Sequence, residues 1–372
     1  MLLRTALLLA LSTASVALHA QEFQFDAALA DDILPVGRQA LQAETRMGVS
    51  NDYFDAQGQK RALFANFDNL PLNSFFPALP GINLGATKLR SKLTGQRVNI
   101  TYGYGFSDNL TAGFMLGWGR LTNQIDFSVA GASISDATQI VQAILASSSY
   151  GYKPVASVTT EGPLDPHIGF RWRVARGENW STIIVPAIRI GIANKDDPDN
   201  LVDVHLTDGS SALMLAAEQR YRRGQAEMRA YGQYTQPLAD KLRARPYAAG
   251  SLPLVAQAHT ETLERKVGGM WRMELEGAYR TGNWRAMSRL EYTHTLATRY
   301  SSPSGQAVSG LEANTDGYDL VARLGLSWNG IHDYLAEKAG LPIILALDYS
   351  TMLKARNEIK SDNVYLTATL PF

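Results

Sequence analysis

The chain of 372 residues contains no cysteine, carries charge on only 19% of its residues and has no net charge at neutral pH. The missing cysteines exclude disulfide scaffolds, cysteine zinc sites, thiol nucleophiles and a lipid-bearing cysteine. The charged share lies below the roughly 25% of a typical soluble domain. Basic and acidic residues are equal in number, so the chain as a whole has no electrostatic attraction for nucleic acid. No apolar run reaches the roughly 18 residues of a membrane-spanning helix. We therefore expect neither a helical membrane protein nor a partner of nucleic acid.

The segment 1–20 has the form of a secretory signal peptide. It carries one positive charge at Arg4, continues through the apolar stretch Leu7–Leu11 and ends on the small residue Ala20. An apolar centre this short cannot cross a hydrocarbon core about 30 Å thick. The pattern predicts an exported protein whose segment 21–38 is periplasmic or enters the lumen of the domain that follows, as a plug or a tether.

From residue 39 onward, apolar residues alternate with polar or small ones. The clearest case is Gln96–Phe106, where Val98, Ile100 and Tyr102 share one parity. Successive side chains of a strand point to opposite faces, so each such segment has one apolar and one polar face. The alternation predicts strands at 39–53, 95–106, 110–129, 166–176, 180–193, 211–222, 225–236, 265–280, 284–300, 315–328, 342–354 and 361–372.

These segments are joined alternately by short turns and by long polar connections. That layout is typical of transmembrane β-barrels, which have short periplasmic turns, long external loops and an even number of strands. We expect an all-β fold: a single-chain transmembrane antiparallel β-barrel of about 12 strands covering 39–372. A count of 14 stays open if Ala62–Phe67 forms a strand. The alternative is a secreted or periplasmic β-sandwich, whose outward face would be polar.

The last strand ends on an aromatic residue. Val364, Leu366, Ala368, Leu370 and the terminal Phe372 share one parity. This ending is similar to the C-terminal signal that barrel-assembly machinery recognises, so we assign Phe372 as an assembly signal. The expected location is the outer membrane of a Gram-negative bacterium, and the expected partners are the assembly machinery, outer-membrane lipids, lipopolysaccharide and a small-molecule solute.

The parity opposite to the apolar one is rich in charge and should line the lumen. These side chains either pair across strands and fill the interior, or form a constriction that screens solutes by size and charge. Gly113, Met115, Gly117 and Gly119 should leave room on the opposite wall. The lumen-lining candidates are Arg97, Arg171, Arg173, Arg189, Glu218, Arg220, Arg222, Glu227, Arg229, Arg272, Glu274, Glu276, Arg285, Arg289 and Glu291.

Two stretches have helical spacing. Ser135–Ser148 carries an apolar stripe with Ser135 as its N-cap, and lies in a long external connection. It should fold over the mouth, enter the lumen or pack on the rim. Gly330–Ala339 should form a short periplasmic turn helix.

Chemical motifs are scarce. No two histidines of the exported chain have zinc-ligand spacing, and no Gly-x-Ser-x-Gly nucleophile motif is present. The aspartates of the connection 194–210 offer oxygen ligands for a surface calcium ion, but they lack the spacing of a defined calcium loop and favour a solvated turn. We expect no enzyme activity, no cofactor and no metal site.

Two stretches carry a family resemblance. The hairpin Thr101–Leu116 (TYGYGFSDNLTAGFML) and the stretch Tyr53–Lys60 (YFDAQGQK) resemble motifs of the MetA-pathway phenol-degradation family. That group of outer-membrane barrels is related in function to FadL-like transporters of hydrophobic compounds. The resemblance implies uptake of a small hydrophobic or aromatic compound and supplies no site residues.

The function we expect is passive, substrate-selective uptake of small hydrophobic, aromatic or amphipathic solutes through an outer-membrane channel. A structural or surface-recognition barrel without transport, and an outer-membrane hydrolase, remain alternatives. Conductance would separate the first from the second, and a Ser/His or Asp/His constellation at the rim would favour the third.

Overall fold

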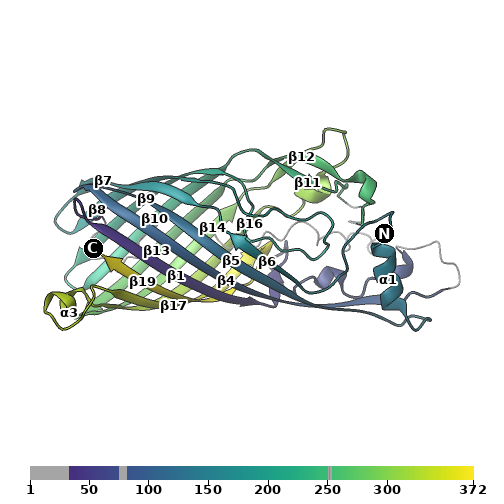
Figure 1. Cartoon of the computed structure of the whole chain (residues 1–372), viewed down its shortest axis with the longest axis horizontal. Helices are drawn as coiled ribbons and strands as arrows, with labels where there is room; N and C mark the ends of the chain where they lie inside the picture. Colours follow the sequence, from purple (N-terminus) through teal and green to yellow (C-terminus); the bar gives the residue numbers. More distant parts are fainter. Residues whose placement is uncertain (1–32, 75–81, 250, 252–253) are drawn as a thin grey trace.

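The computed structural model describes residues 33–74, 82–249, 251 and 254–372. The signal peptide expected at 1–20 lies outside these residues. Twelve long strands form one closed antiparallel barrel, in the order β4-β1-β19-β17-β16-β14-β13-β10-β9-β8-β7-β5, and β4 also pairs with β5. The predicted barrel of 12 strands is confirmed (Figure 1).

The strands of the barrel wall follow the sequence alternation closely. They are β1 (Gln39–Ser50), β4 (Ala86–Ser107), β5 (Leu110–Ala130), β7 (His167–Arg176), β8 (Trp180–Arg189), β9 (Ala212–Arg223), β10 (Ala226–Pro237), β13 (Met270–Thr281), β14 (Trp284–Thr295), β16 (Gly317–Asn329), β17 (Ile344–Arg356) and β19 (Asp362–Pro371). β4 begins nine residues before the predicted start at 95, because 86–94 extends the pairing with β5 from Ala86↔Ala130 to Thr94↔Thr122. This extension projects beyond the rest of the wall (Figure 1).

The remaining elements lie mainly in the long connections. The strands are β2 (Asp52–Phe54), β3 (Lys60–Ala62), β6 (Val158–Pro163), β11 (Asp240–Ala244), β12 (Glu261–Lys266), β15 (Arg299–Ser301) and β18 (Glu358–Ile359). The helices are α1 (Ala137–Leu145), α2 (Ser309–Glu312) and α3 (Ile331–Leu335), and the 3-10 turns are η1 (Ala65–Phe67), η2 (Leu72–Ser74) and η3 (Gln257–His259). No helix of the described residues is long and apolar enough to cross a membrane.

The open question of a strand at Ala62–Phe67 is answered by these elements. β3 pairs with β2 in a small three-stranded sheet with β18, and η1 follows it, so neither enters the barrel wall. The wall therefore has 12 strands and not 14.

The closing seam joins the first and the last strand of the barrel wall. β1 pairs with β19 from Ala40↔Pro371 to Val49↔Asp362. Gln39 N–H donates to the Phe372 carbonyl at 2.8 Å, and Phe372 N–H donates back to Gln39 at 2.9 Å. Phe372, the expected assembly signal, thus ends the seam strand with its ring half exposed.

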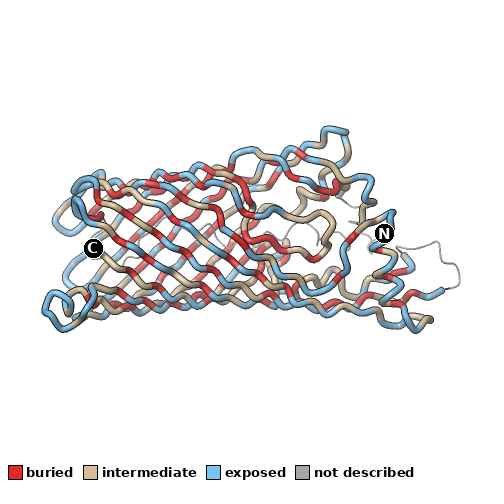
Figure 2. The backbone as a smooth tube through the Cα atoms, viewed as in Figure 1, coloured by how far each residue is buried: buried red, intermediate tan, exposed pale blue. Residues whose placement is uncertain are grey.

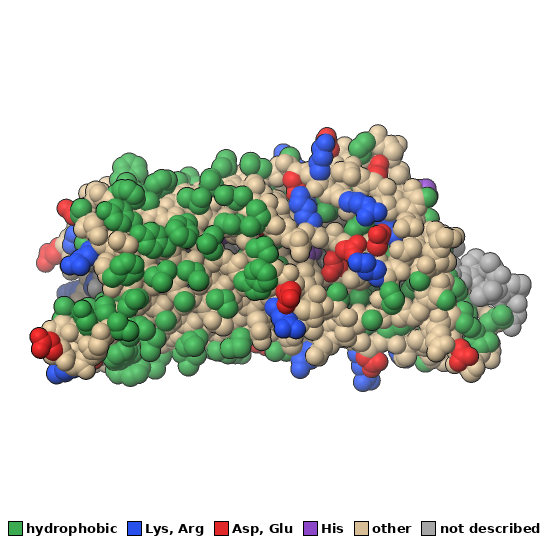
Figure 3. Space-filling view, in the orientation of Figure 1, with side chains coloured by type: hydrophobic (Ala, Val, Ile, Leu, Met, Phe, Trp, Pro, Cys, Tyr) green, Lys and Arg blue, Asp and Glu red, His purple; other side chains and the backbone are tan. Residues whose placement is uncertain are grey.

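Burial alternates along every wall strand (Figure 2). In β5, for example, Leu116 and Trp118 are 50% and 55% exposed, whereas Met115 between Phe114 and Leu116 is 5% exposed. In Figure 3, apolar side chains cover the outside of the barrel over the left half, while charged side chains lie over the right half and, in smaller number, at the left rim. A band of this kind is what a barrel in a lipid bilayer requires, and it contradicts the polar outer face of a soluble sandwich.

The two predicted helices form close to their expected positions. α1 covers Ala137–Leu145 and is preceded by Asp136 rather than by Ser135 as N-cap, with no side-chain capping bond. α3 covers Ile331–Leu335 in the connection between β16 and β17. It lies at the barrel end that carries the short turns and the C-terminus (Figure 1).

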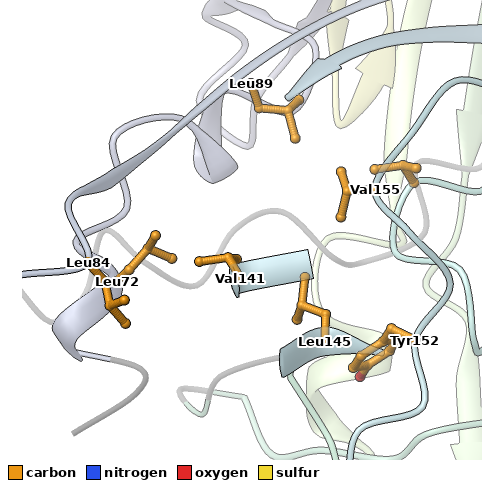
Figure 4. Packing of buried hydrophobic residues seen from close by; sticks show 8 residues of the cluster. Leu72, Leu84, Leu89, Val141, Leu145, Tyr152 and Val155 are labelled. Atoms are coloured by element: carbon orange, nitrogen blue, oxygen red, sulfur yellow. The ribbon is translucent and has the colours of Figure 1, made fainter. Parts of the chain in front are cut away.

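α1 packs at the external end of the barrel and does not enter the lumen. Its Val141 and Leu145 belong to an apolar cluster with Leu72, Leu84, Leu89, Tyr152, Val155 and Val202 (Figure 4). Ile125, Phe127 and Val129, the inward-parity residues of the β5 extension, pack against this cluster. The helix therefore rests on the inner face of the extended β4–β5 hairpin.

Candidate functional site

The lumen-lining candidates differ in how deeply the barrel buries them. Arg173, Arg220 and Glu227 are partly buried, and Arg222 is exposed near the turn that joins β9 to β10. The buried members are Arg97, Arg171, Arg189, Glu218, Arg229, Arg272, Glu274, Glu276, Arg285, Arg289 and Glu291. Most of their neighbours on the same strands are exposed, and many of these are apolar, so the charges project into the barrel.

Most of these buried charges form one network, which we call the ionic layer. On one side of it, Glu218 accepts hydrogen bonds from Arg171 at 3.0 Å, from Arg220 at 2.5 Å and from Arg229 at 2.9 Å. A carboxylate that leaves water needs several charge-assisted bonds to offset its lost hydration. Glu218, whose side chain is fully buried, has three guanidinium partners.

Arg229 connects this carboxylate to the next strand. Its Nη1 donates to Glu274 at 2.8 Å, and Glu274 also pairs with Arg272 at 2.7 Å. Arg289 donates to Glu276 at 2.7 Å. Arg272 also reaches Glu291 at 2.8 Å, and Arg285 bonds both Glu276 and Glu227. The ionic layer thus runs across β7, β9, β10, β13 and β14.

The ionic layer is charge-paired rather than open. Strands 4.7–4.9 Å apart allow long side chains to meet across the wall, and the alternation of arginine with glutamate lets each guanidinium reach an acid. Of the two alternatives for these side chains, the arginines of β9, β10, β13 and β14 follow the first, because they pair with glutamates on the same or a neighbouring strand. They stabilise the interior and narrow it.

The wall at β5 is also filled, and it lies beside the ionic layer rather than opposite to it, because β5 pairs with β7. A Cβ atom added to Gly117 would come within 2.8 Å of Leu164, and one added to Gly119 would lie 2.9 Å from Leu164 and 3.0 Å from Leu206. Leu164 and Leu206 belong to external connections and are buried. Gly117 and Gly119 leave room, as expected, but Leu164 and Leu206 occupy that room, so it is not available to a solute.

The N-terminal segment contributes a second obstruction. Ile33 is 3% exposed and packs with Met115, Ile183, Val185, Ala216 and Tyr231, which are inward residues of β5, β8, β9 and β10. Leu34 N–H donates to the Thr111 hydroxyl at 2.9 Å. The first described residues, Ile33 and Leu34, therefore lie inside the barrel. This position agrees with the arrangement in which the segment 21–38 enters the lumen. The part of Phe23–Pro35 before residue 33 lies outside the described residues.

Two cavities flank the obstructed middle of the barrel. One, of about 230 Å³, lies near the short turns and is lined by Arg173, Arg176, Glu178, Arg222 and Glu227 among others. The other, of about 130 Å³, lies toward the external loops; we call it the loop-side cavity. Its lining combines apolar side chains, such as Met115, Leu164, Leu242 and Met270, with charged and hydroxyl groups.

Most charged groups of the loop-side cavity have strong partners. Arg189 donates to both oxygens of Asp208 at 2.8 and 2.9 Å, and Arg265 donates to Asp240 at 2.8 and 2.6 Å. Asp165 accepts from the backbone of Ile192 and Ala193. These bonds fix the loops that form the roof of the cavity.

Asp196 is an acid of this lining whose carboxyl has a raised pKa. Burial raises the pKa of its carboxyl, and the neighbouring Asp203 and Asp197 add to that shift, while His205 opposes it. A carboxyl with a raised pKa holds its proton to higher pH than one in water. Asp196 thus places a titratable charge at the external side of the lumen.

The other aspartates of the connection 194–210 are held by basic groups or by backbone N–H groups. Asp197 accepts from Lys153 at 2.6 Å, Asp199 from Arg245 at 2.5 Å, and Asp203 from the Asp197 backbone at 3.1 Å. Among the described residues, no group of three or more histidine, aspartate or glutamate side chains is arranged to hold a metal ion.

Sequence reasoning missed Leu164, Leu206 and Asp196 as residues of the interior, and it left open whether the segment that contains Ile33 enters the lumen. None belongs to a wall strand, so the two-residue period could not find them. The only sequence signal for Leu164 and Leu206 was the glycines at 117 and 119, which indicate close approach of another group to a strand.

Comparison with known proteins supports the fold. No protein-family model matches the chain, and no curated protein matches it by sequence. The COG4313 outer membrane channel from Pseudomonas putida F1 has a similar structure, with a TM-score of 0.60, 13% identity and coverage of 94% of this chain and 100% of that chain.

Two other barrels align with lower scores. The translocator domain of the autotransporter NalP from Neisseria meningitidis has a TM-score of 0.44 at 12% identity, over 92% of this chain and 91% of that chain. A FadL homologue from Pseudomonas aeruginosa has a TM-score of 0.40 at 12% identity, over 97% of each chain. The resemblance drawn from the sequence is confirmed at the level of the fold by the COG4313 channel.

Proposed function

We propose that the protein is a passive, substrate-selective channel for small hydrophobic, aromatic or amphipathic solutes in the outer membrane of a Gram-negative bacterium, and that it has no enzyme activity. The observation that carries this proposal is the loop-side cavity of about 130 Å³ inside the closed barrel. An apolar protein cavity of about 150 Å³ holds one benzene molecule. The cavity therefore has the size of a single ring.

The obstruction of the lumen supports selectivity over general diffusion. Eight strands leave an interior filled by side chains, and 16 or more leave an open channel. This barrel of 12 strands is narrowed further by the ionic layer, by Ile33 and by the two loop leucines. A small solute that can enter the mixed lining of the cavity should pass, and a bulky polar solute should not. The fold-level likeness to a protein described as an outer membrane channel agrees with this proposal.

The test is solute flux through purified protein in liposomes. Swelling should be faster with a single-ring solute such as benzamide than with a disaccharide, and faster than in liposomes without protein. Absence of flux for both solutes would overturn the proposal and favour a structural or surface-recognition barrel.

A further inference from the structure

Arg46 and Arg97 are two buried guanidiniums without an acidic partner. They lie directly opposite each other in the register of β1 and β4, on the inward face of both strands. Arg46 is 9% exposed and Arg97 is 4% exposed. Like charges placed opposite each other across two strands are destabilising, and a buried charge is costly unless it is paired.

The contacts of these two arginines differ from those in the ionic layer. Arg46 Nε donates to the amide oxygen of Asn363 at 3.1 Å, and its guanidinium lies 5.4 Å from the centre of the Tyr365 ring. Arg97 has one long contact, from Nη2 to the Leu206 carbonyl at 3.5 Å, and its buried Nε has no hydrogen-bond partner. Among the ion pairs of the described residues, none involves either arginine, although Glu44 and Asp165 lie near enough to attract Arg97 electrostatically.

Arg97 projects toward the loop-side cavity and lines it together with His167. His167 is 3% exposed, and its Nδ1 is buried without a hydrogen-bond partner. The other two guanidiniums of the described cavity wall, Arg189 and Arg265, are saturated by Asp208 and Asp240. Among the described side chains that line this cavity, the buried polar atoms without a hydrogen-bond partner are thus Arg97 Nε and His167 Nδ1.

We propose that the loop-side cavity binds an anionic solute, a carboxylic acid the size of a single ring, with its carboxylate at Arg97 and its ring against Met115 and Leu164. A planar guanidinium matches a carboxylate with two parallel bonds. The negative charge would also relieve the repulsion between Arg97 and Arg46. This inference rests on the proposed transport function and names its solute class.

Binding of benzoate and of its neutral analogue benzamide to the full-length protein in detergent tests the site. The wild type should bind benzoate more tightly than benzamide. Arg97→Met should weaken benzoate binding by about tenfold or more, the effect of losing a charge-assisted bond, and leave benzamide binding nearly unchanged. Arg97→Lys keeps the charge but loses the bidentate geometry, so it should be intermediate.

Arg120→Met is the matched control. Arg120 lies on β5, with a side chain that is 60% exposed and 3.8 Å from Glu161, and its loss should not affect benzoate binding. Thermal unfolding gives a second measurement: Arg97→Met should raise the unfolding temperature, because it removes an unpaired buried charge. A structural arginine would lower it on removal.

The outcomes separate the site from the transport function. Equal binding of benzoate and benzamide by the wild type, or unchanged benzoate binding in Arg97→Met, would overturn the site while benzamide flux in liposomes still supported transport. Absence of flux for both solutes would overturn the transport function, whatever the binding. If Arg97→Met fails to fold, the benzoate binding of Arg97→Lys tests the site instead, and an affinity equal to that of the wild type would overturn it.

Discussion

Arg229 of β10 donates from Nη1 to Glu274 of β13 at 2.8 Å, inside the barrel and away from water. The same guanidinium donates from Nε to Glu218 on its other side. One side chain thereby joins three strands through charge rather than through apolar packing. The interior of this barrel consequently depends on complementary charges, and removal of one of them leaves others buried without a partner.

The first prediction concerns Glu218→Gln. This change removes a carboxylate shared by Arg171, Arg220 and Arg229. Breaking a buried ion pair from one side costs about 3–5 kcal/mol, so the variant should unfold at a clearly lower temperature, measured by the heat-dependent shift in gel mobility. Glu178→Gln, at an exposed turn position, should behave as the wild type. Equal unfolding of both variants would show that the ionic layer does not stabilise the barrel.

The second prediction concerns Ile33→Ala. Loss of this buried side chain, which packs on five inward residues of the wall, should cost about 2–5 kcal/mol. It should also increase the rate of benzamide-driven liposome swelling, since Ile33 obstructs the lumen. Val36→Ala is the control, because Val36 is 58% exposed. An Ile33→Ala variant with wild-type swelling would mean that the solute does not pass this residue.

The barrel wall could be predicted from the sequence because a strand in a membrane barrel has two constant environments. Lipid selects apolar residues at one parity, as at Leu116 and Trp118, and the interior selects polar or small ones at the other. An alternation with a period of two residues therefore predicts both where a strand lies in the sequence and which of its side chains face the lipid. Arg46 and Arg97 could be placed inward in this way. That they lie directly opposite each other could be known only from the register between β1 and β4.

The filling of the lumen could not be predicted in this way. Leu164 and Leu206 reach the interior from connections and Ile33 reaches it from the N-terminal segment. Residues of these parts have no repeating environment, so their apolar character carries no positional information. Likewise, the sequence shows that arginine and glutamate are both abundant on the inward parity. It does not show that Arg229 is shared between Glu218 and Glu274, which depends on three strands in register.

The third prediction tests the orientation of β5. Leu116 faces outward within the apolar band and is 50% exposed. An arginine on the lipid face costs about 2–4 kcal/mol near the middle of the bilayer, so Leu116→Arg should reduce the folded yield in lipid vesicles. Arg173→Leu, a change of opposite sense on the inward face of β7, should reduce it much less. Equal losses would contradict the orientation of these strands.

The last prediction concerns pH and Asp196. The carboxyl has a raised pKa, so the folded protein holds this proton more tightly than the unfolded chain does. Its contribution to stability is therefore greatest in acid and falls as the pH rises through the raised pKa. The charge that appears over the same range lies in the lining of the loop-side cavity, where it repels an anion. Acidification should therefore increase the uptake of an anionic ring compound.

Benzenesulfonate is a suitable probe because it stays anionic over the whole range. Its flux into liposomes should rise several-fold as the pH falls through the raised pKa of Asp196. Asp196→Asn should show the high flux already at neutral pH and a weaker response to acid. His205 also lines the cavity, so His205→Gln separates its contribution from that of Asp196. If Asp196→Asn has the same flux and the same pH response as the wild type, Asp196 does not control the entry of anions.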